Sequence, residues 1–185
     1  MAATKDLGNI LGGGGDDSAV RVAAKGSTLP TDVTADPVTP FASVGWLSED
    51  GVSFARSEDR QTFKAHQGGT IVKRKTASTD DTFKFQCLET TALVLGLLYK
   101  GATVTVATGV ATIPVANQTV TDERAWVIDE KLDDGSTMRY VIPNGSAQLT
   151  GDVVWKTDEM TVYEFTVGVN GDYTVITDAP GVVGA

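Results

Sequence analysis

The residue types that most often perform catalysis are scarce in this sequence of 185 residues, and they stand apart from one another. His66 is the single histidine, and the chain has no G-x-S-x-G or H-E-x-x-H motif that would build a hydrolytic site around it. Cys87 is the single cysteine and alternates with Phe83 and Phe85, which places its thiol among apolar side chains. This pattern predicts that the protein is not an enzyme, with His66 in a loop and Cys87 in the core.

Carboxylates are plentiful, but they are not spaced to hold a metal ion. Eight pairs of adjacent acidic residues occur, and none has the D-x-D-x-D-G spacing of a calcium-binding loop. The glycine-rich stretch LGGGGDDS, residues 11–18, lacks the Gly-Lys-Ser/Thr that completes a phosphate-binding loop. We therefore expect no cofactor and no metal ion, and we interpret most of the acidic pairs as solvated turns.

Positive charge gathers at one place, Lys73, Arg74 and Lys75. The whole chain has a formal net charge of −9, with 24 acidic and 15 basic residues, which opposes binding of a phosphate backbone by attraction. A nucleic-acid contact is one interpretation of this basic run, and we favour ion pairs with acids of another copy of the chain. The charge-free stretch 101–121 contains six threonines and alternates, so it predicts two strands rather than a membrane span.

The elements that must position these side chains are mainly β-strands. TFKFQCL (82–88) and YEFTVGV (163–169) alternate apolar and polar residues with period two, as half-buried strands do. A single helix is predicted at about residues 90–100, where ETTALVLGLLYKG carries an apolar stripe at helical spacing and ends on Gly101. The fold class expected is mainly β, an antiparallel β-sandwich or barrel with one short helix.

Three turn dipeptides predict hairpins. For the clearest, Asp134-Gly135, we expect a two-residue turn that pairs Glu130 with Arg139, Ile128 with Val141 and Val127 with Ile142. Weaker signals are Thr108-Gly109 and Asn170-Gly171.

The N-terminal part of the chain differs in composition from the rest. Residues 1–18 are rich in glycine and acid and cannot bury a core of their own, and three prolines follow within residues 29–40. We therefore predict an N-terminal arm and extended linker at residues 1–40 and one β-domain at residues 41–185. The arm is expected to dock on a neighbouring subunit.

Four stretches, in this order, resemble a known family. They are RVAAKGSTLPTD (21–32), VGWLSEDGV (44–52), TFKAHQGGTIVKRK (62–75) and TFKFQCLETTALVLGLLYKG (82–101). Together they are similar to the major tail tube proteins of long-tailed, non-contractile bacteriophages. His66 stands where that family has an aromatic residue.

The resemblance implies a fold shared with type VI secretion tube proteins and a structural function. Subunits of the family join into hexameric rings, and the rings stack into the hollow tail tube through which DNA passes during ejection. It implies a virion protein assembled in the host cytoplasm, with tape measure, terminator and tip proteins as partners, DNA as a passenger that does not stick, and no membrane. The alternatives are a β-sandwich binding module, such as a tail-tip or receptor-binding component, and a small hydrolase.

Two sets of residues are the candidate functional sites. We predict the contact between stacked rings in a long projecting loop, residues 47–69, because more than twenty residues without an evident strand are usually functional. Its polar residues are Glu49, Asp50, Arg56, Glu58, Asp59, Arg60, Lys64 and His66. We also predict a net negative lumen, because an attractive wall would hold DNA. The candidate lumen acids are Asp129, Glu130, Asp152 and Glu164.

Overall fold

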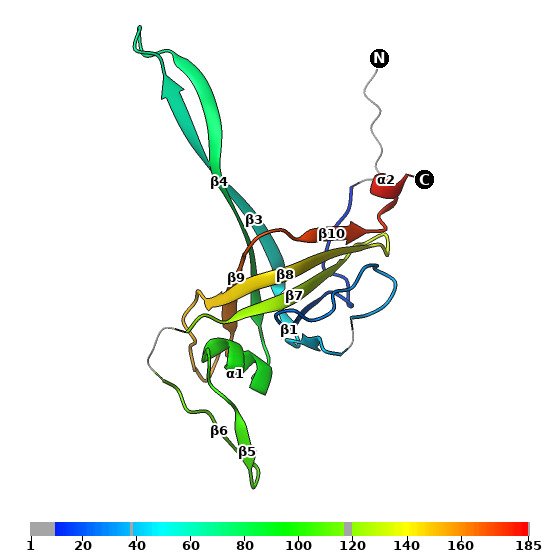
Figure 1. Cartoon of the computed structure of the whole chain (residues 1–185). Helices are drawn as coiled ribbons and strands as arrows, with labels where there is room; N and C mark the ends of the chain where they lie inside the picture. Colours follow the sequence, from blue (N-terminus) through cyan, green and yellow to red (C-terminus); the bar gives the residue numbers. More distant parts are fainter. Residues whose placement is uncertain (1–9, 38, 117–119, 185) are drawn as a thin grey trace.

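One antiparallel sheet forms the body of the protein. The computed structural model describes residues 10–37, 39–116 and 120–184, and eight of its strands form a sheet in the order β2-β1-β7-β8-β9-β4-β3, with β10 paired to β8 (Figure 1). The strands are β1 (Ala19–Ala24), β2 (Ala42–Ser43), β3 (Leu47–Lys64), β4 (Ile71–Cys87), β5 (Thr105–Ala107), β6 (Val110–Thr112), β7 (Glu123–Lys131), β8 (Thr137–Leu149), β9 (Tyr163–Val169) and β10 (Thr174–Thr177). The helices are α1 (Ala92–Leu98) and α2 (Pro180–Val183).

The predicted fold class is confirmed, in that the chain is mainly β and its sheet is antiparallel. Both strands assigned from period-two alternation form, as β4 and β9, and they pair with each other. Closure into a barrel is not observed, because no pairing joins the end strands β2 and β3 within the described ranges.

The central hairpin of β7 and β8 forms with a register one residue away from the predicted one. Asp129, rather than Glu130, lies opposite Arg139. The loop is longer than two residues: the Leu132 amide donates to the Ser136 carbonyl at 2.9 Å, and Gly135 adopts a φ of 85°. A three-residue loop with a left-handed glycine adds one residue to the connection, which shifts every pair that follows.

The two weaker hairpin signals have different outcomes. Thr108-Gly109 joins β5 to β6, with Ala107 opposite Val110, as predicted. The prediction at Asn170-Gly171 is wrong, because β10 pairs with β8 rather than folding back on β9. Strand β9 pairs with only the second half of β8, which leaves the first half of β8 free to pair with β10.

The core lies on both faces of β7, whose residues from Ala125 to Asp129 are all buried. Trp126 and Ile128 belong to the larger cluster, which also holds Phe83, Phe85 and Phe165. The opposite face carries a smaller cluster of buried residues, Ala23, Phe41, Ala125 and Val127. Because successive side chains of a strand point to opposite faces, β7 is covered on both sides.

Helix α1 covers the larger cluster with Val94 and Leu97, which are both buried. It begins after Thr91, whose hydroxyl accepts a hydrogen bond from the Val94 amide at 3.2 Å. Such a cap satisfies an amide that has no partner within the helix. The helix predicted at residues 90–100 therefore forms at that place.

The segment before residue 40 contributes a strand to the sheet. Strand β1 pairs with β7 along its whole length and is largely buried. Upstream of it, the Gly15 amide donates to the Lys131 carbonyl and the Asp133 amide to the Gly12 carbonyl. Docking on a neighbouring subunit was expected for the arm. The described part of the arm contacts its own domain, at the β7–β8 turn.

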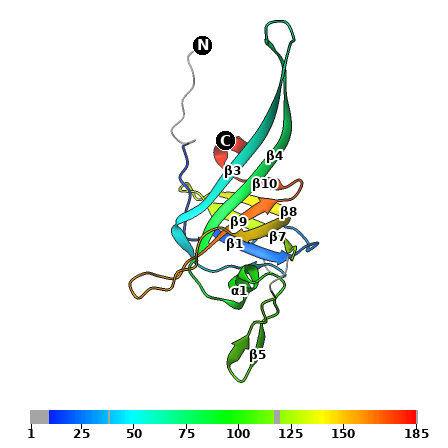
Figure 2. The same cartoon turned by 90° about the vertical axis from the view of Figure 1, so that its left-hand side faces the viewer.

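The most prominent feature is a long hairpin of β3 and β4, called the long hairpin below. It projects from one end of the body, and the short β5–β6 hairpin projects from the other end (Figures 1 and 2). The loop predicted at residues 47–69 is therefore mostly a strand, with only a short turn beyond Lys64. Because neither face of this strand is buried, charged residues occur at adjacent as well as alternate positions. The sequence therefore lacks the period-two alternation that marks a half-buried strand.

Candidate functional site

The distal part of the long hairpin is a two-stranded ribbon without cover. Every residue from Ser53 to Asp80 is exposed except Ala65, which is partly buried. Strand β9 pairs with β4 only from Thr82 to Cys87, so beyond that point β3 and β4 have no further neighbour among the described strands. A two-stranded hairpin alone in water is marginally stable at best. The ribbon is therefore a surface that lacks a partner in the single chain.

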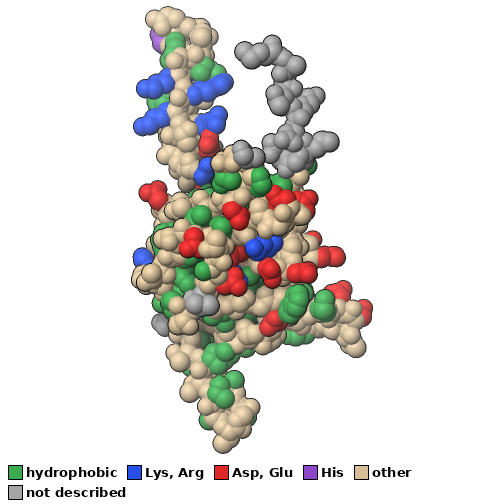
Figure 3. Space-filling model, turned by 90° about the vertical axis from the view of Figure 1, so that its right-hand side faces the viewer, with side chains coloured by type: hydrophobic (Ala, Val, Ile, Leu, Met, Phe, Trp, Pro, Cys, Tyr) green, Lys and Arg blue, Asp and Glu red, His purple; other side chains and the backbone are tan. Residues whose placement is uncertain are grey.

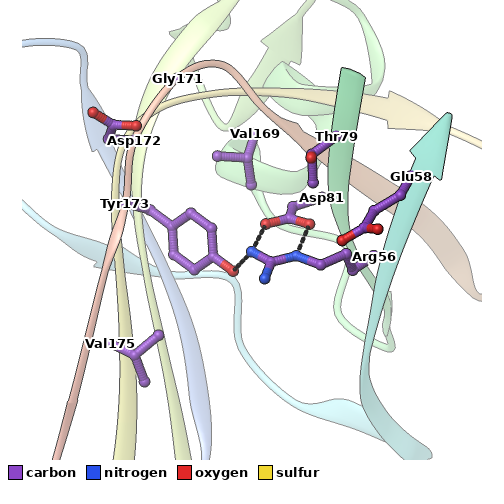
Figure 4. A pocket seen from close by; sticks show the side chains of 9 residues that line it. All are labelled: Arg56, Glu58, Thr79, Asp81, Val169, Gly171, Asp172, Tyr173 and Val175. Carbon is purple, nitrogen blue, oxygen red and sulfur yellow. Dashed lines mark hydrogen bonds and ion pairs between the residues drawn. The ribbon is translucent and has the colours of Figure 1, made fainter. Parts of the chain in front are cut away.

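At the root of the ribbon, an ion pair joins the two strands to each other, and a hydrogen bond joins them to the body. The Arg56 guanidinium donates to both carboxylate oxygens of Asp81, at 2.7 and 2.6 Å, and to the Tyr173 hydroxyl at 3.3 Å (Figure 4). Asp81 is opposite Arg56 in the strand register, whereas Tyr173 comes from the segment between β9 and β10. Phe54 adds an aromatic contact across the root, with its ring centroid 5.0 Å from that of Phe83.

The charges at the root stabilise one another. The paired guanidinium holds the pKa of Asp81 below its ordinary value, against the opposing effect of burial, and Asp81 in turn raises that of Arg56. Burial is also the main cause of a raised pKa for Tyr173. A bidentate arginine–carboxylate pair is geometrically specific. Arg56 is therefore a residue that fixes the base of the ribbon.

Away from the root, the ribbon becomes purely basic. Between Asp59 and Asp80 there is no acidic residue, and residues 60–79 carry five basic side chains, Arg60, Lys64, Lys73, Arg74 and Lys75. We call residues 60–79 the basic tip. The tip accounts for +5 of the formal charge of −9, so the remainder of the chain carries −14. Blue side chains on the ribbon and red ones on the body show this division in Figure 3.

The predicted contact residues are distributed along this hairpin. Glu49 and Asp50 lie near the base of β3, where the register shifts. Glu58 forms an ion pair with Arg60 at 2.6 Å. Asp59 is exposed in the middle of β3, Lys64 ends β3, and His66 lies exposed in the terminal turn. The acidic residues of this set therefore lie toward the root of the hairpin, and Lys64 and His66 lie at its tip.

A family model described as phage tail tube protein matches residues 12–172, most of the chain. The chain belongs to the phage tail tube protein family. The tail tube protein is therefore a structural component of the virion tail and not an enzyme.

Solved structures give weaker likenesses to the tail tube protein, and no curated protein sequence matches it. A chain from the virion of a native gene transfer agent particle has a TM-score of 0.44 and 11% identity, over 88% of this chain and 97% of that chain. A chain from the tail of an empty gene transfer agent particle, refined with C6 symmetry, has a TM-score of 0.40 and 12% identity, over 87% and 96% of the two chains. Likenesses at this level add nothing to the family assignment.

The four candidate lumen acids of the tail tube protein lie in different environments. The prediction is wrong for Asp129, which is 2% exposed and accepts hydrogen bonds from Arg139 at 2.6 and 2.9 Å. Sequence reasoning missed this buried ion pair, because the register error placed Glu130 opposite Arg139. Arg139 also donates to the carbonyls of Asp32 and Ala35, at 2.6 and 2.9 Å, and so ties the N-terminal segment to the sheet.

The other three acids remain near the surface. Asp152 is exposed, Glu164 pairs with Lys84 at 3.1 Å, and Glu130 is partly buried. Burial raises the pKa of Glu130, while Lys84 and Gln86 hold that of Glu164 below its ordinary value.

The residues considered for catalysis lie far apart in the tail tube protein. Cys87 is fully buried in the main core and His66 lies in the terminal turn of the long hairpin. Within the described ranges no group of three or more His, Cys, Asp and Glu could hold a metal ion. Among the same residues, no helix is long and apolar enough to cross a membrane.

Proposed function

We propose that this tail tube protein forms hexameric rings and that the long hairpin of each subunit connects its ring to the next, building the hollow tube for DNA passage. The observation that carries this proposal is the uncovered ribbon. A long, exposed two-stranded ribbon gains stability when a second protein surface covers it. Among the exposed apolar residues near its end are Phe63, Ile71 and Val72, and burying these would favour such a contact.

The separation of charge supports stacking in one direction. Copies with a basic tip and an acidic body attract one another head to tail and repel one another tip to tip. A head-to-tail interface uses two different surfaces and generates an open filament when the rotation does not close. Lys73, Arg74 and Lys75 accordingly serve as partners for acids of another subunit.

The sheet supports the ring in a similar way. Its path ends on two different strands, the very short β2 and the long β3. Exposed strand edges are templates for pairing with another chain, and two unlike edges allow each subunit to contact both neighbours around a ring. Contacts between unlike edges are heterologous, as a closed cyclic ring requires.

DNA is proposed to pass through the tube without binding to it. Asp152 and Glu164 remain candidate lumen residues, and Glu130 is a weaker one because its charged form is disfavoured by burial. A net negative wall gives DNA no cations with which to exchange its counterions. Tape measure, terminator and tip proteins are the further partners proposed, with assembly in the host cytoplasm.

Negative-stain microscopy of the purified protein tests this proposal. We expect rings and tubes from the wild type. Replacing residues 60–77 by Asn-Gly would join Asp59 to Ser78, which lie opposite each other. This variant should keep the sheet signature in circular dichroism and form no tubes. Wild-type protein that remains monomeric, or long tubes from the shortened variant, would contradict the proposal. Short capped assemblies from the wild type would favour the tail-tip alternative.

A further inference from the structure

A cavity of about 390 Å³ lies beside the base of β3, at the end of that strand remote from the basic tip. Four acidic residues line it, Asp16, Glu49, Glu89 and Glu130, and none of its lining residues in the described part of the chain is a lysine or arginine. Trp46 also lines the cavity and is 74% exposed. We call this cavity the acidic pocket.

The acidic pocket contains hydrogen-bond acceptors without donors. The Oε1 atom of Glu130 and the Oγ atom of Ser48 are buried and have no hydrogen-bond partner among the described residues. Buried polar atoms normally have a partner. Burial also raises the pKa of Glu130, and the nearby charge of Asp129 adds to this effect. A positively charged donor that reached the Oε1 atom of Glu130 would give it a hydrogen bond and favour the ionised carboxylate.

The remaining walls of the pocket are held in place. Glu89 accepts a hydrogen bond from the Trp46 amide at 2.8 Å, and Gly45 leaves the space that its carboxylate occupies, since a Cβ atom there would lie 2.4 Å from the Glu89 carboxyl carbon. Glu89 is thereby fixed beside the Trp46 backbone. Carboxylates in a pocket that an exposed indole also lines suit a lysine or arginine side chain, which an aromatic ring can attract by a cation–π interaction.

The basic tip has the complementary chemistry. Lys64, Lys73, Arg74 and Lys75 are absent from the ion pairs among the described residues. The tip of the same chain is out of reach: Lys73 lies opposite Phe63, which is roughly 45 Å along β3 from Glu49 at about 3.3 Å per residue. The tip of a second copy is free to approach.

We propose that the acidic pocket receives a basic side chain from residues Lys73, Arg74 and Lys75 of a subunit in the adjacent ring. This inference rests on the proposed stacking of rings and names the surface that receives the hairpin. Tip and pocket lie at opposite ends of β3, so each bound copy presents a free tip or a free pocket for the next. Repetition of this contact extends the tube.

Charge reversal at both surfaces tests the pairing. The tip variant carries Lys73→Glu and Lys75→Glu, and the pocket variant carries Asp16→Lys and Glu49→Lys, all at exposed positions. We expect the critical concentration for tube assembly to rise by about tenfold or more in each variant, because like charges then meet at the contact. One chain carrying all four substitutions should recover assembly close to that of the wild type. Circular dichroism establishes that each variant is folded.

A matched control reverses two exposed acids outside the pocket, Asp158→Lys and Glu159→Lys, with the same change in net charge. This control should assemble as the wild type does. Normal assembly of the pocket variant with failure of the tip variant would overturn the pairing and leave stacking by the hairpin intact. Failure of the combined variant to recover would also overturn the pairing. Normal assembly of both variants would contradict the proposed function as well.

Carbodiimide cross-linking of wild-type tubes gives a second, direct readout. Zero-length links from Lys73 or Lys75 to Asp16, Glu49 or Glu130 should be found by mass spectrometry, and they should be absent below the critical concentration. Such links join different copies, because the two surfaces of one chain are too far apart. Tubes in which these lysines link to other acids alone would overturn the inference.

Discussion

Arg56 and Asp81 hold the two strands of the long hairpin together at the point where the ribbon leaves the body. Asp81 is largely buried while about half of the Arg56 side chain is exposed. The pair is therefore partly screened by solvent, which limits its contribution to stability, and its bidentate geometry fixes how the two strands lie at the root. The Tyr173 hydroxyl adds a link to the segment that follows β9.

The pH dependence of stability should reveal the Arg56–Asp81 pair. Because Arg56 holds the pKa of Asp81 below its ordinary value, the pair contributes stability above the unfolded pKa of about 3.9. This contribution is lost as the pH falls through the lower folded pKa. Asp81→Asn should therefore lower the urea midpoint at pH 7 and match the wild type at the most acidic pH. A difference between the two proteins that is constant with pH would contradict this account.

The buried pair of Arg139 and Asp129 should contribute much more to folding. Both side chains are almost fully buried. Removing Arg139 takes away the two hydrogen bonds that its guanidinium donates to the Asp129 carboxylate, and it leaves Arg21 as the one cation paired with Asp129 among the described residues. We expect Arg139→Leu to lower the free energy of unfolding by about 3–5 kcal/mol. Arg124→Leu is the matched control, since Arg124 pairs with Asp122 nearer the surface and should cost under about 1 kcal/mol. Equal losses in urea denaturation of the two variants would show that burial does not decide the effect.

Cys87 should be chemically inert in the folded protein. Burial raises the pKa of its thiol to about 12, and the thiolate is the reactive form. Native protein at pH 8 should not react with Ellman's reagent, whereas unfolded protein should release one equivalent of the coloured thiolate. Ser57→Cys, at an exposed position of β3, provides a reactive control. Rapid labelling of native wild-type protein would show that the strand opens readily.

At the level of elements, the sequence predicted the helix and the strands that carry a clear periodic pattern of apolar residues. Alternation of apolar residues found β9 and the inner end of β4, and helical spacing with a following glycine found α1. Pairings that depend on distant residues were missed. Strand β1 lies beside β7, about a hundred residues later in the chain. Val20 and Val22 alternate with Arg21 in the sequence, but this local pattern does not say which strand they pair with. The basic tip was visible as charge, but its strand conformation was not, because both of its faces are exposed.

Hydrogen exchange should distinguish the two parts of the long hairpin. In the free subunit, amides of residues 60–79 should exchange rapidly, because a two-stranded ribbon opens easily. Amides of β4 from Phe83 to Cys87 should be protected by pairing on both sides. Assembly should extend protection to the tip. Unchanged exchange at the tip in assembled tubes would show that the ribbon does not form the contact between rings.

At the scale of the whole molecule, the protein has unlike ends. A basic, uncovered ribbon projects from a body that carries the negative charge, and the acidic pocket lies at the far end of β3. An object with two unlike, complementary ends assembles in one direction. Membership in the tail tube family and this polarity agree with the proposed stacking of rings.

A helical cryo-microscopy reconstruction of tubes grown from the purified protein tests this account most directly. We expect sixfold rings in which each long hairpin crosses to the adjacent ring and is covered there. Residues Lys73–Lys75 should then lie beside the acidic pocket of a subunit in that ring. A reconstruction in which the hairpins stand uncovered on the outside of the tube, while other surfaces join the rings, would contradict it.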